Sequence, residues 1–249
     1  MTLNEYYNFP EDANVTLKYT SFFDEQTDSF PCPADMSYAF YRQKRYCIKM
    51  FDTANVTNMN YMFGNCNNLM LIPEFNTTNV TDMSNMFRDC RKLTSIPEFN
   101  TTNVTNMSNM FSGCNNLTSI PEIDTANVTD MNYMFNTCDN LTSIPPLNCQ
   151  NINTKNYYPI YKYSNYEYLT DIGGFIDMKM SWDNNYGLAK CPNLTYESCI
   201  NILNGLYDFT GNGETPNSNQ GKLKVNSAFI DLVGEQISIA SNKGWVITA

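Results

Sequence analysis

The chain has 249 residues, of which 42% are hydrophobic, so it is long enough to bury a core of its own. Its 15 Lys and Arg against 25 Asp and Glu give a net charge of −10, which argues against binding to a nucleic-acid backbone. Histidine, the usual general base near neutral pH and the commonest metal ligand, is absent. We therefore expect no enzyme activity, no cofactor, no metal site and no nucleic-acid partner.

The N-terminal segment, residues 1–34, is aromatic and acidic, and we interpret it as an attachment or cap segment. It lacks the basic region and apolar run of a secretory signal peptide, and no later stretch of the sequence is long and apolar enough to span a membrane. The nine cysteines are odd in number and form no CxxC pair, so free thiols are expected. These features predict a protein that is made and kept in a cytoplasm, or that leaves by cell lysis.

The middle of the chain, residues 35–152, is a tandem repeat of 24 residues. One copy reads NVTDMSNMFRDCRKLTSIPEF, and weaker copies flank the array, such as LTDIGGF at residues 169–175. The four best copies begin without a gap at Asn55, Asn79, Asn103 and Asn127. Frayed ends of this kind are typical of solenoids that are capped by atypical repeats.

Each copy has seven fixed apolar positions, which in the second copy are Val80, Met83, Met86, Phe87, Cys90, Leu93 and Ile96. Their spacing of three or four residues indicates a helical or tightly turned segment, and LTSI indicates a short strand that ends at Pro97. A unit this small cannot bury its own apolar face, so the copies must stack. The sequence therefore predicts an α/β solenoid of 24-residue units, each a short strand plus a short helix or turn, with capping segments.

The cysteine column of the repeats has two interpretations. It consists of Cys66, Cys90, Cys114 and Cys138. Neighbouring cysteines fall near the Cα separation of ~4.4–6.8 Å that a disulfide permits, but a row of small buried side chains is favoured, because paired thiols need an oxidising compartment. The methionines beside this column are interpreted as core filling rather than as a metal-binding stripe.

Two polar columns recur as well. The Asn of each Asn-Val-Thr triplet is formally a glycosylation acceptor, but side-chain amides that bond the backbone of adjacent turns explain a stacked Asn column better. Glu74, Glu98 and Glu122 form an acidic column that is broken at Pro146. A cation or a basic partner is one interpretation of this column, and a solvated face is the favoured one.

Residues 153–191 are interpreted as a tyrosine-rich degenerate repeat or insert. Its tyrosines suit a contact site for a protein or a sugar, or they cover the C-terminal edge of the solenoid, and both interpretations stay open. A charged patch in the second copy is either another contact or a contribution to solubility. Together they give a candidate contact surface of Tyr157, Tyr158, Tyr161, Tyr163, Tyr166, Tyr168, Arg88, Arg91 and Lys92.

Residues 192–249 are interpreted as a C-terminal helical cap. Cys199, Leu203, Leu206 and Tyr207 share one helical face, and Gly244 provides a helix stop before Trp245. The glycine-containing stretch at residues 210–221 lacks the Lys-Ser/Thr of a phosphate-binding loop, so we expect a flexible connection there.

The repeat resembles the BspA-type leucine-rich repeat proteins, whose copies share its Met/Phe, Cys, Leu and Ile-Pro layout. This resemblance covers residues 35–152 and implies a leucine-rich-repeat-like, right-handed solenoid with an open sheet, which serves as an adhesive surface and not as a catalyst. The segment from Leu194, which ends in NKGW, is similar to the closing segment of repeat proteins from gut bacteriophages and prophages.

Two functional hypotheses follow. The first is a bacteriophage virion structural protein of a tail, baseplate or fibre, made in the bacterial cytoplasm, which contacts other virion proteins or a host-surface protein or glycan within an oligomeric assembly. The second is a bacterial cell-surface leucine-rich repeat adhesin, for which the sequence shows no export signal or anchor. Membrane insertion is expected in neither case. An enzyme is disfavoured, since carboxylate pairs such as Asp24 and Glu25 lie in unpatterned sequence.

Overall fold

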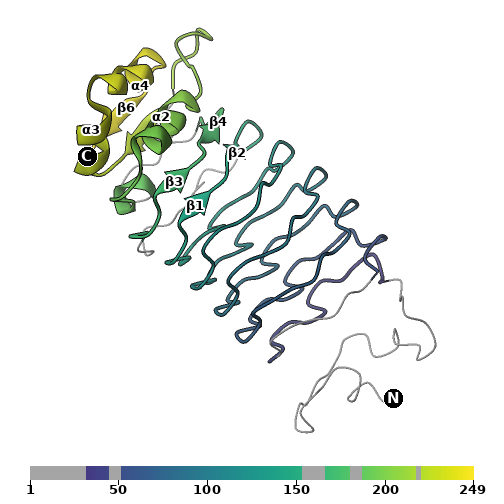
Figure 1. Cartoon of the computed structure of the whole chain (residues 1–249). Coiled ribbons are helices and arrows are strands. Elements are labelled where there is room, and N and C mark those ends of the chain that lie inside the picture. Colours follow the sequence, from purple (N-terminus) through teal and green to yellow (C-terminus); the bar gives the residue numbers. More distant parts are fainter. Residues whose placement is uncertain (1–31, 45–51, 153–165, 180–186, 217–219) are drawn as a thin grey trace, which may run out of the picture.

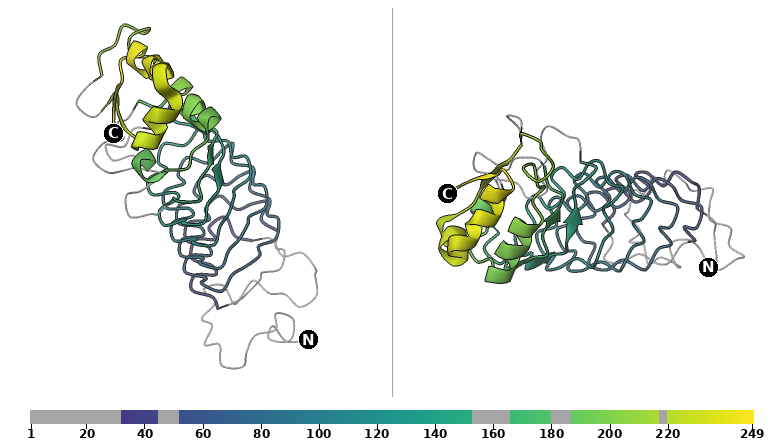
Figure 2. Two further views of the ribbon diagram at one scale, coloured as in Figure 1. Left: turned by 60° about the vertical axis from the view of Figure 1, so that its left-hand side comes forward. Right: turned by 90° about the horizontal axis from the view of Figure 1, so that it is seen from above.

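A computed structural model describes residues 32–44, 52–152, 166–179, 187–216 and 220–249 (Figure 1). The 24-residue repeats lie one behind another as coils, and the C-terminal residues form a small helical unit at one end of this stack (Figures 1 and 2). Of the predicted attachment or cap segment, residues 1–34, all but the last three residues lie outside the described ranges. Tyr157, Tyr158, Tyr161 and Tyr163 of the predicted contact surface lie outside them as well.

Backbone hydrogen bonds join each coil to the next, with an offset of 24 residues from Asn58 onward and one residue less between Asp35 and Asn58. Coil-to-coil amide bonds recur along the stack, for example from the Phe87 nitrogen to the Met110 oxygen at 2.9 Å. A chain of parallel bridges runs through Asp35, Asn58, Asp82, Asn106 and Asp130. Since each coil from Asn58 onward bonds to the following one in the same way, the period of the sequence is also the register of the stack there.

The fixed apolar positions form a continuous core. In the second copy they are all fully buried except Ile96, which is partly buried. The phenylalanine of each coil stacks on that of the next, with ring centroids 5.4–6.0 Å apart and planes inclined by 12° or less. These stacked rings belong to Phe40, Phe63, Phe87, Phe111 and Phe135. The methionine column lies beside them in the same core.

The segment from Val80 to Leu93 is a series of turns. Asn85 and Asp89 have φ angles of 58° and 59°, which lie outside the region that a right-handed helix requires. Short-range bonds close the turns, such as that from the Cys90 nitrogen to the Phe87 oxygen at 3.0 Å. Of the helical and turned interpretations of the apolar spacing, the structure has the turned one in this copy.

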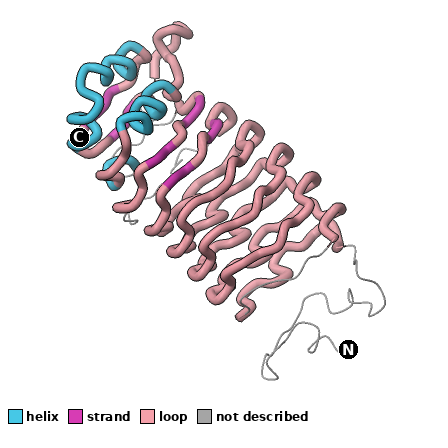
Figure 3. The backbone as a smooth tube through the Cα atoms, viewed as in Figure 1, coloured by secondary structure: helices cyan, strands magenta, loops and turns pink. Residues whose placement is uncertain are grey.

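Regular strands of the stack lie near its C-terminal end (Figure 3). β1 (Ser143–Ile144) pairs in parallel with β3 (Asp171–Ile172), and β2 (Leu147–Asn148) pairs in parallel with β4 (Phe175–Ile176). Earlier in the stack, neighbouring LTSI segments are joined by a backbone hydrogen bond from the Thr118 nitrogen to the Thr94 oxygen at 3.3 Å. Because the proline that follows each segment has no N–H group, the ladder ends there.

A helical cap follows the last coil. It contains the 3-10 helices η2 (Gly187–Lys190) and η3 (Gly234–Ile237), the helices α2 (Tyr196–Asn204), α3 (Ser227–Val233) and α4 (Ser238–Asn242), and the parallel pair β5 (Lys222–Lys224) and β6 (Val246–Thr248). The Thr195 hydroxyl caps α2 by accepting a bond from the Ser198 nitrogen at 3.2 Å. Gly244, with φ at 85°, leads from α4 into the buried Trp245.

Among the helices in the described ranges, none has the length and apolar character needed to cross a lipid bilayer.

Candidate functional site

Polar side chains couple neighbouring coils outside the apolar core. The amides of Asn79, Asn103 and Asn127 each donate to a backbone oxygen of the preceding coil, at 2.7–2.8 Å, which confirms the structural interpretation of this column for these three residues. A second column, Thr53, Thr77, Thr101 and Thr125, is buried and donates from its hydroxyls to the next coil at 2.9–3.1 Å. Sequence reasoning missed this threonine column, although its 24-residue period is visible in the alignment.

The cysteine column is also a hydrogen-bonded column. The Cys114 thiol donates to the Phe87 oxygen of the preceding coil at 3.1 Å, and the equivalent thiols repeat this contact. Burial raises the pKa of the Cys90 and Cys114 thiols well above the ordinary value. None of the eight cysteines in the described ranges belongs to a disulfide. This geometry agrees with the interpretation of a row of small buried side chains and gives no reactive thiolate.

Each coil has two residues with positive φ angles, which form two columns along one edge of the stack. The first column is Tyr38, Tyr61, Asn85, Asn109 and Tyr133, with φ between 52° and 59°. The second column is Arg42, Asn65, Asp89, Gly113 and Thr137, with φ between 54° and 81°. Asn, Asp and Gly adopt this region most readily, whereas other residues pay roughly 1–3 kcal/mol. The two tyrosines of the first coils therefore carry a backbone cost that Asn85 and Asn109 largely avoid.

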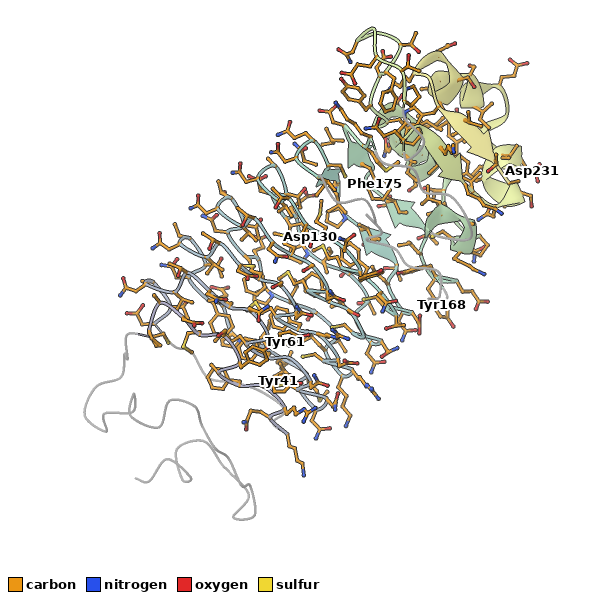
Figure 4. All side chains as sticks on the ribbon, turned by 180° about the vertical axis from the view of Figure 1, so that it is seen from behind. Tyr41, Tyr61, Asp130, Tyr168, Phe175 and Asp231 are labelled. Atoms are coloured by element: carbon orange, nitrogen blue, oxygen red, sulfur yellow. The ribbon has the colours of Figure 1, made fainter. Side chains whose placement is uncertain are left out.

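Three tyrosines form a cluster at the N-terminal end of this edge. We call Tyr38, Tyr41 and Tyr61 the tyrosine cluster. The rings of Tyr38 and Tyr61 stack with centroids 4.9 Å apart, and Tyr41 meets both rings edge-on at 5.3 and 5.8 Å. Figure 4 shows Tyr41 and Tyr61 beside each other at this end of the stack. Gly64 leaves room for the cluster, since a Cβ atom there would lie 2.7 Å from the Tyr61 ring.

Two arginine side chains contact the tyrosine cluster. The Arg88 guanidinium donates to the Tyr61 hydroxyl at 3.1 Å, and the Arg42 guanidinium carbon lies 5.1 Å from the centre of the Tyr41 ring. Arg88 and Arg91 each lie 3.7 Å from a carboxylate oxygen of Asp89. We call Arg42, Lys44, Arg88, Arg91 and Lys92 the basic edge.

The basic edge stands out in the charge distribution along the repeats. Residues 35–92 contain seven Lys and Arg and five Asp and Glu, whereas residues 93–152 contain no Lys or Arg and five Asp and Glu. The first coils are therefore the basic end of an otherwise acidic stack, and this end coincides with the tyrosine cluster.

Some residues of the predicted contact surface are exposed in the structure, and another is buried. Tyr166 is completely buried, and its hydroxyl donates to the Phe135 oxygen at 2.7 Å, so its prediction as a surface contact is wrong. The physical reason is that its ring covers the apolar edge of a coil while its hydroxyl satisfies a backbone acceptor. Tyr168 is 58% exposed. Arg88 and Arg91 lie together on the basic edge, and the exposed Lys92 belongs to the same turn.

The tyrosine cluster was not among the predicted contact residues. Tyr38 and Tyr41 precede the four best copies of the repeat, where the 24-residue alignment is weak. The alignment does indicate that this position is variable, because Tyr61 and Tyr133 occupy the position that holds Asn85 and Asn109 in two other copies. Without the φ angles, however, nothing in the sequence marks this column as one where a tyrosine is costly.

A cleft lies where the cap meets the stack. This cleft has a volume of about 490 Å³ and is lined by residues of β4, the end of α2 and the loop that follows, together with Lys243. The Lys243 ammonium donates to the Asn204 and Leu206 oxygens at 2.6 and 3.0 Å, and burial lowers its pKa. The Asp208 carboxylate accepts a bond from the Gly211 nitrogen at 2.6 Å. These two charged groups of the cleft therefore stabilise local structure.

The acidic column of Glu74, Glu98 and Glu122 is exposed on the stack. Across the described ranges, no group of three or more Cys, Asp or Glu side chains is placed to hold a metal ion. The alternative of a basic partner for this column stays a prediction.

One known protein family matches the repeat region of the chain. Residues 34–148 match a family described as "Mycoplasma protein of unknown function, DUF285". This family is associated with BspA-like repeat proteins, in agreement with the resemblance of the repeats. No curated protein matches the chain.

Proposed function

We propose that this protein is a non-enzymatic structural component of a bacteriophage particle, in a tail, baseplate or fibre, where its repeats bind other proteins or the host surface. The fold class that we propose with it is a leucine-rich-repeat-like, right-handed α/β solenoid. The observation that carries the binding role is the tyrosine cluster with its basic edge, which presents aromatic and guanidinium groups from consecutive coils. Tyr and Arg are the residue types most enriched among those that dominate binding energy at interfaces.

The regular stacking supports a binding role. Backbone bonds and the Thr and Asn columns tie each coil to the next, so exposed groups on adjacent coils hold a fixed spacing of about 4.8 Å. A surface that is already ordered loses little conformational entropy when a partner binds. Variation of exposed side chains on a constant frame is the means by which repeat proteins acquire partners.

The cleft at the cap supports a structural interpretation better than a catalytic one. Lys243 and Asp208 both bond to backbone groups, which gives each of them a structural role. We therefore propose a function without catalysis and without a cofactor.

The C-terminal segment supports the virion part of the proposal. Its sequence is similar to the closing segments of repeat proteins from gut bacteriophages and prophages, and in this chain it folds as a cap with Trp245 buried. The proposed partners are other virion proteins and a host-surface protein or glycan, within an oligomeric particle. The proposed location is the virion, after synthesis in the bacterial cytoplasm.

Purified particles test this proposal. Phage from the host that carries this gene would be banded in a density gradient, and the chain would be quantified against the major capsid protein by mass spectrometry. We expect a fixed ratio across the particle peak and labelling of one substructure by antibodies against the chain in electron micrographs. Absence of the chain from the banded particles would refute the virion assignment.

A bacterial surface adhesin is the second candidate, and the match to the BspA-associated family favours it. The same antibodies separate the two candidates, because an adhesin labels the envelope of cells that release no phage. Labelling of those cells together with particles that lack the chain would establish the adhesin in place of the virion protein.

A further inference from the structure

We propose that the tyrosine cluster and the basic edge form a binding site for an anionic polysaccharide. A sugar ring would lie on Tyr38, the exposed member of the stacked pair, and carboxylates of the polymer would pair with the guanidinium groups. This inference deepens the proposed function, since it names the ligand class of the host-contacting surface.

The backbone at the tyrosines is the first argument. Tyr38 and Tyr61 adopt φ angles of 59° and 52° in a column where Asn85 and Asn109 have 58° and 56°. The frame accepts Asn at this position, so the fold itself does not require an aromatic ring. Tyr133 has a φ of 58° in the same column, so the angle alone does not distinguish the cluster; Tyr38 and Tyr61 differ from Tyr133 in that their rings stack on each other.

The presentation of the rings is the second argument. Tyr38 is 43% exposed and belongs to the first described coil, and one face of its ring stacks on Tyr61 of the next coil. Tyr41 meets both rings edge-on, and the Asn65 amide donates to its hydroxyl at 3.2 Å. The three rings are therefore held in place before any ligand arrives. A rigid aromatic face beside amide and hydroxyl groups suits the apolar C–H face and the hydroxyls of a pyranose ring.

The positive charge of the basic edge is the third argument, and it favours an acidic sugar over a neutral one. The Arg42 guanidinium lies over the Tyr41 ring at 5.1 Å, and the Arg88 guanidinium reaches the Tyr61 hydroxyl at 3.1 Å. The planar guanidinium matches a carboxylate with two parallel N–H bonds. Because the remainder of the repeats is acidic, a negatively charged polymer is attracted to this edge and repelled by the rest of the stack.

Titration with defined polymers tests the inference. The full chain would be titrated in a calorimeter with polygalacturonate, with polysialic acid, and with methyl-esterified polygalacturonate, which keeps the sugar rings but lacks the charge. We expect binding to at least one acidic polymer that weakens as salt is raised, and binding to the ester at least about tenfold weaker. No binding to either acidic polymer, or equal binding to the ester, would overturn the proposal.

A matched pair of variants locates the site. Tyr38→Asn places in the first coil the residue that the same column already holds in two other coils, and we expect it to weaken polymer binding about tenfold. Tyr133→Asn makes the same change at φ 58° in the same column but away from the cluster, and its affinity should equal that of the unmodified chain. Equal losses in the two variants, or no loss in Tyr38→Asn, would contradict the assignment.

Poly-L-glutamate separates an acidic polysaccharide from an acidic protein. If it binds as tightly as the better polysaccharide and depends on Tyr38 to the same degree, the edge recognises acidic protein and the polysaccharide assignment fails. The virion test fails independently, because a chain absent from particles could still bind the polymer, and a chain present in particles could bind none.

Discussion

The stack and the cap bury their cores by different means. Between residues 52 and 152, one set of contacts recurs every 24 residues: a stacked Phe, a hydrogen-bonded thiol, a Thr hydroxyl and an Asn amide that each reach a neighbouring coil. The cap has no such period and depends on single contacts, such as the approach of Gly205 to β4. In the stack, each contact is replicated, so a change is felt mainly by adjacent coils. In the cap, one change affects the whole junction.

Alkaline pH gives the largest expected effect and tests the thiols in both regions. Burial raises the pKa of Cys90 and Cys114 in the stack, and it raises the pKa of Cys199 in the cap to about 11. Folded thiols stay protonated, while unfolded thiols ionise near pH 9, so stability falls as pH rises above that value. Each fully buried thiol contributes a loss of about 1.4 kcal/mol per pH unit.

Urea unfolding at several pH values between 8 and 10.5 measures this loss. The double variant Cys90→Ala, Cys114→Ala should show a shallower dependence, by about twice the loss for one thiol. An unchanged dependence in that variant would mean that these thiols are accessible and ionise in the folded protein.

Removal of one stacked ring comes next. Phe87 is fully buried between Phe63 and Phe111, with centroid distances of 5.5 and 5.9 Å. We expect Phe87→Ala to lower the free energy of unfolding by about 3–5 kcal/mol, because the cavity opens inside a continuous column of rings. Urea denaturation followed by circular dichroism measures this change. Tyr168→Ala, on an exposed ring, should stay within about 0.5 kcal/mol, and similar losses in the two variants would argue against the stacked core.

The junction of cap and stack is tested at a glycine. A Cβ atom at Gly205 would lie 2.4 Å from the Phe175 oxygen of β4, so Gly205→Ala forces α2 away from the last coil. We expect a loss of about 1–3 kcal/mol and cleavage of the cap by a protease under conditions where the unmodified chain resists. Gly213→Asn serves as the control, because its site has φ at 68° and open space around it. Resistance of Gly205→Ala equal to that of this control would refute the tight junction.

The threonine column is the next smaller test. The buried Thr101 hydroxyl donates to the Asp124 oxygen at 2.9 Å and accepts from the Asp124 nitrogen at 2.8 Å. Thr101→Val keeps the shape but removes both bonds, which should cost about 1–2 kcal/mol of unfolding free energy. The exposed neighbour Thr102 provides the matched change, Thr102→Val, with almost no cost expected in the same urea titration. A Thr101→Val variant as stable as its control would show that the threonine hydroxyls do not stabilise the stack.

The period of the sequence predicts much of the stack and little of its surface. The positions that become the core, such as Met83, Phe87 and Leu93, follow from the 24-residue alignment, because a residue that every coil repeats is one that the stack buries. The Asn column was explained correctly for the same reason. A period gives no backbone angles, so the turns at Asn85 and the cost of a tyrosine in that column are visible only in the structure.

The wrong prediction for Tyr166 has a similar cause. Composition marked Tyr166 as a contact because tyrosine suits interfaces, but tyrosine suits the edge of a core equally well. Its hydroxyl meets the Phe135 oxygen, 31 residues earlier in the chain, a pairing that no local pattern contains.

Replacement of the two stacked tyrosines should change stability least, because we propose that the tyrosine cluster serves a surface function rather than the fold. The measurement is the melting temperature of the double variant Tyr38→Asn, Tyr61→Asn. Relief of the strained backbone should offset the lost ring contacts, so we predict a melting temperature within about 3 °C of the unmodified chain or above it. A fall of about 8 °C or more would contradict the claim and make these rings part of the structural core.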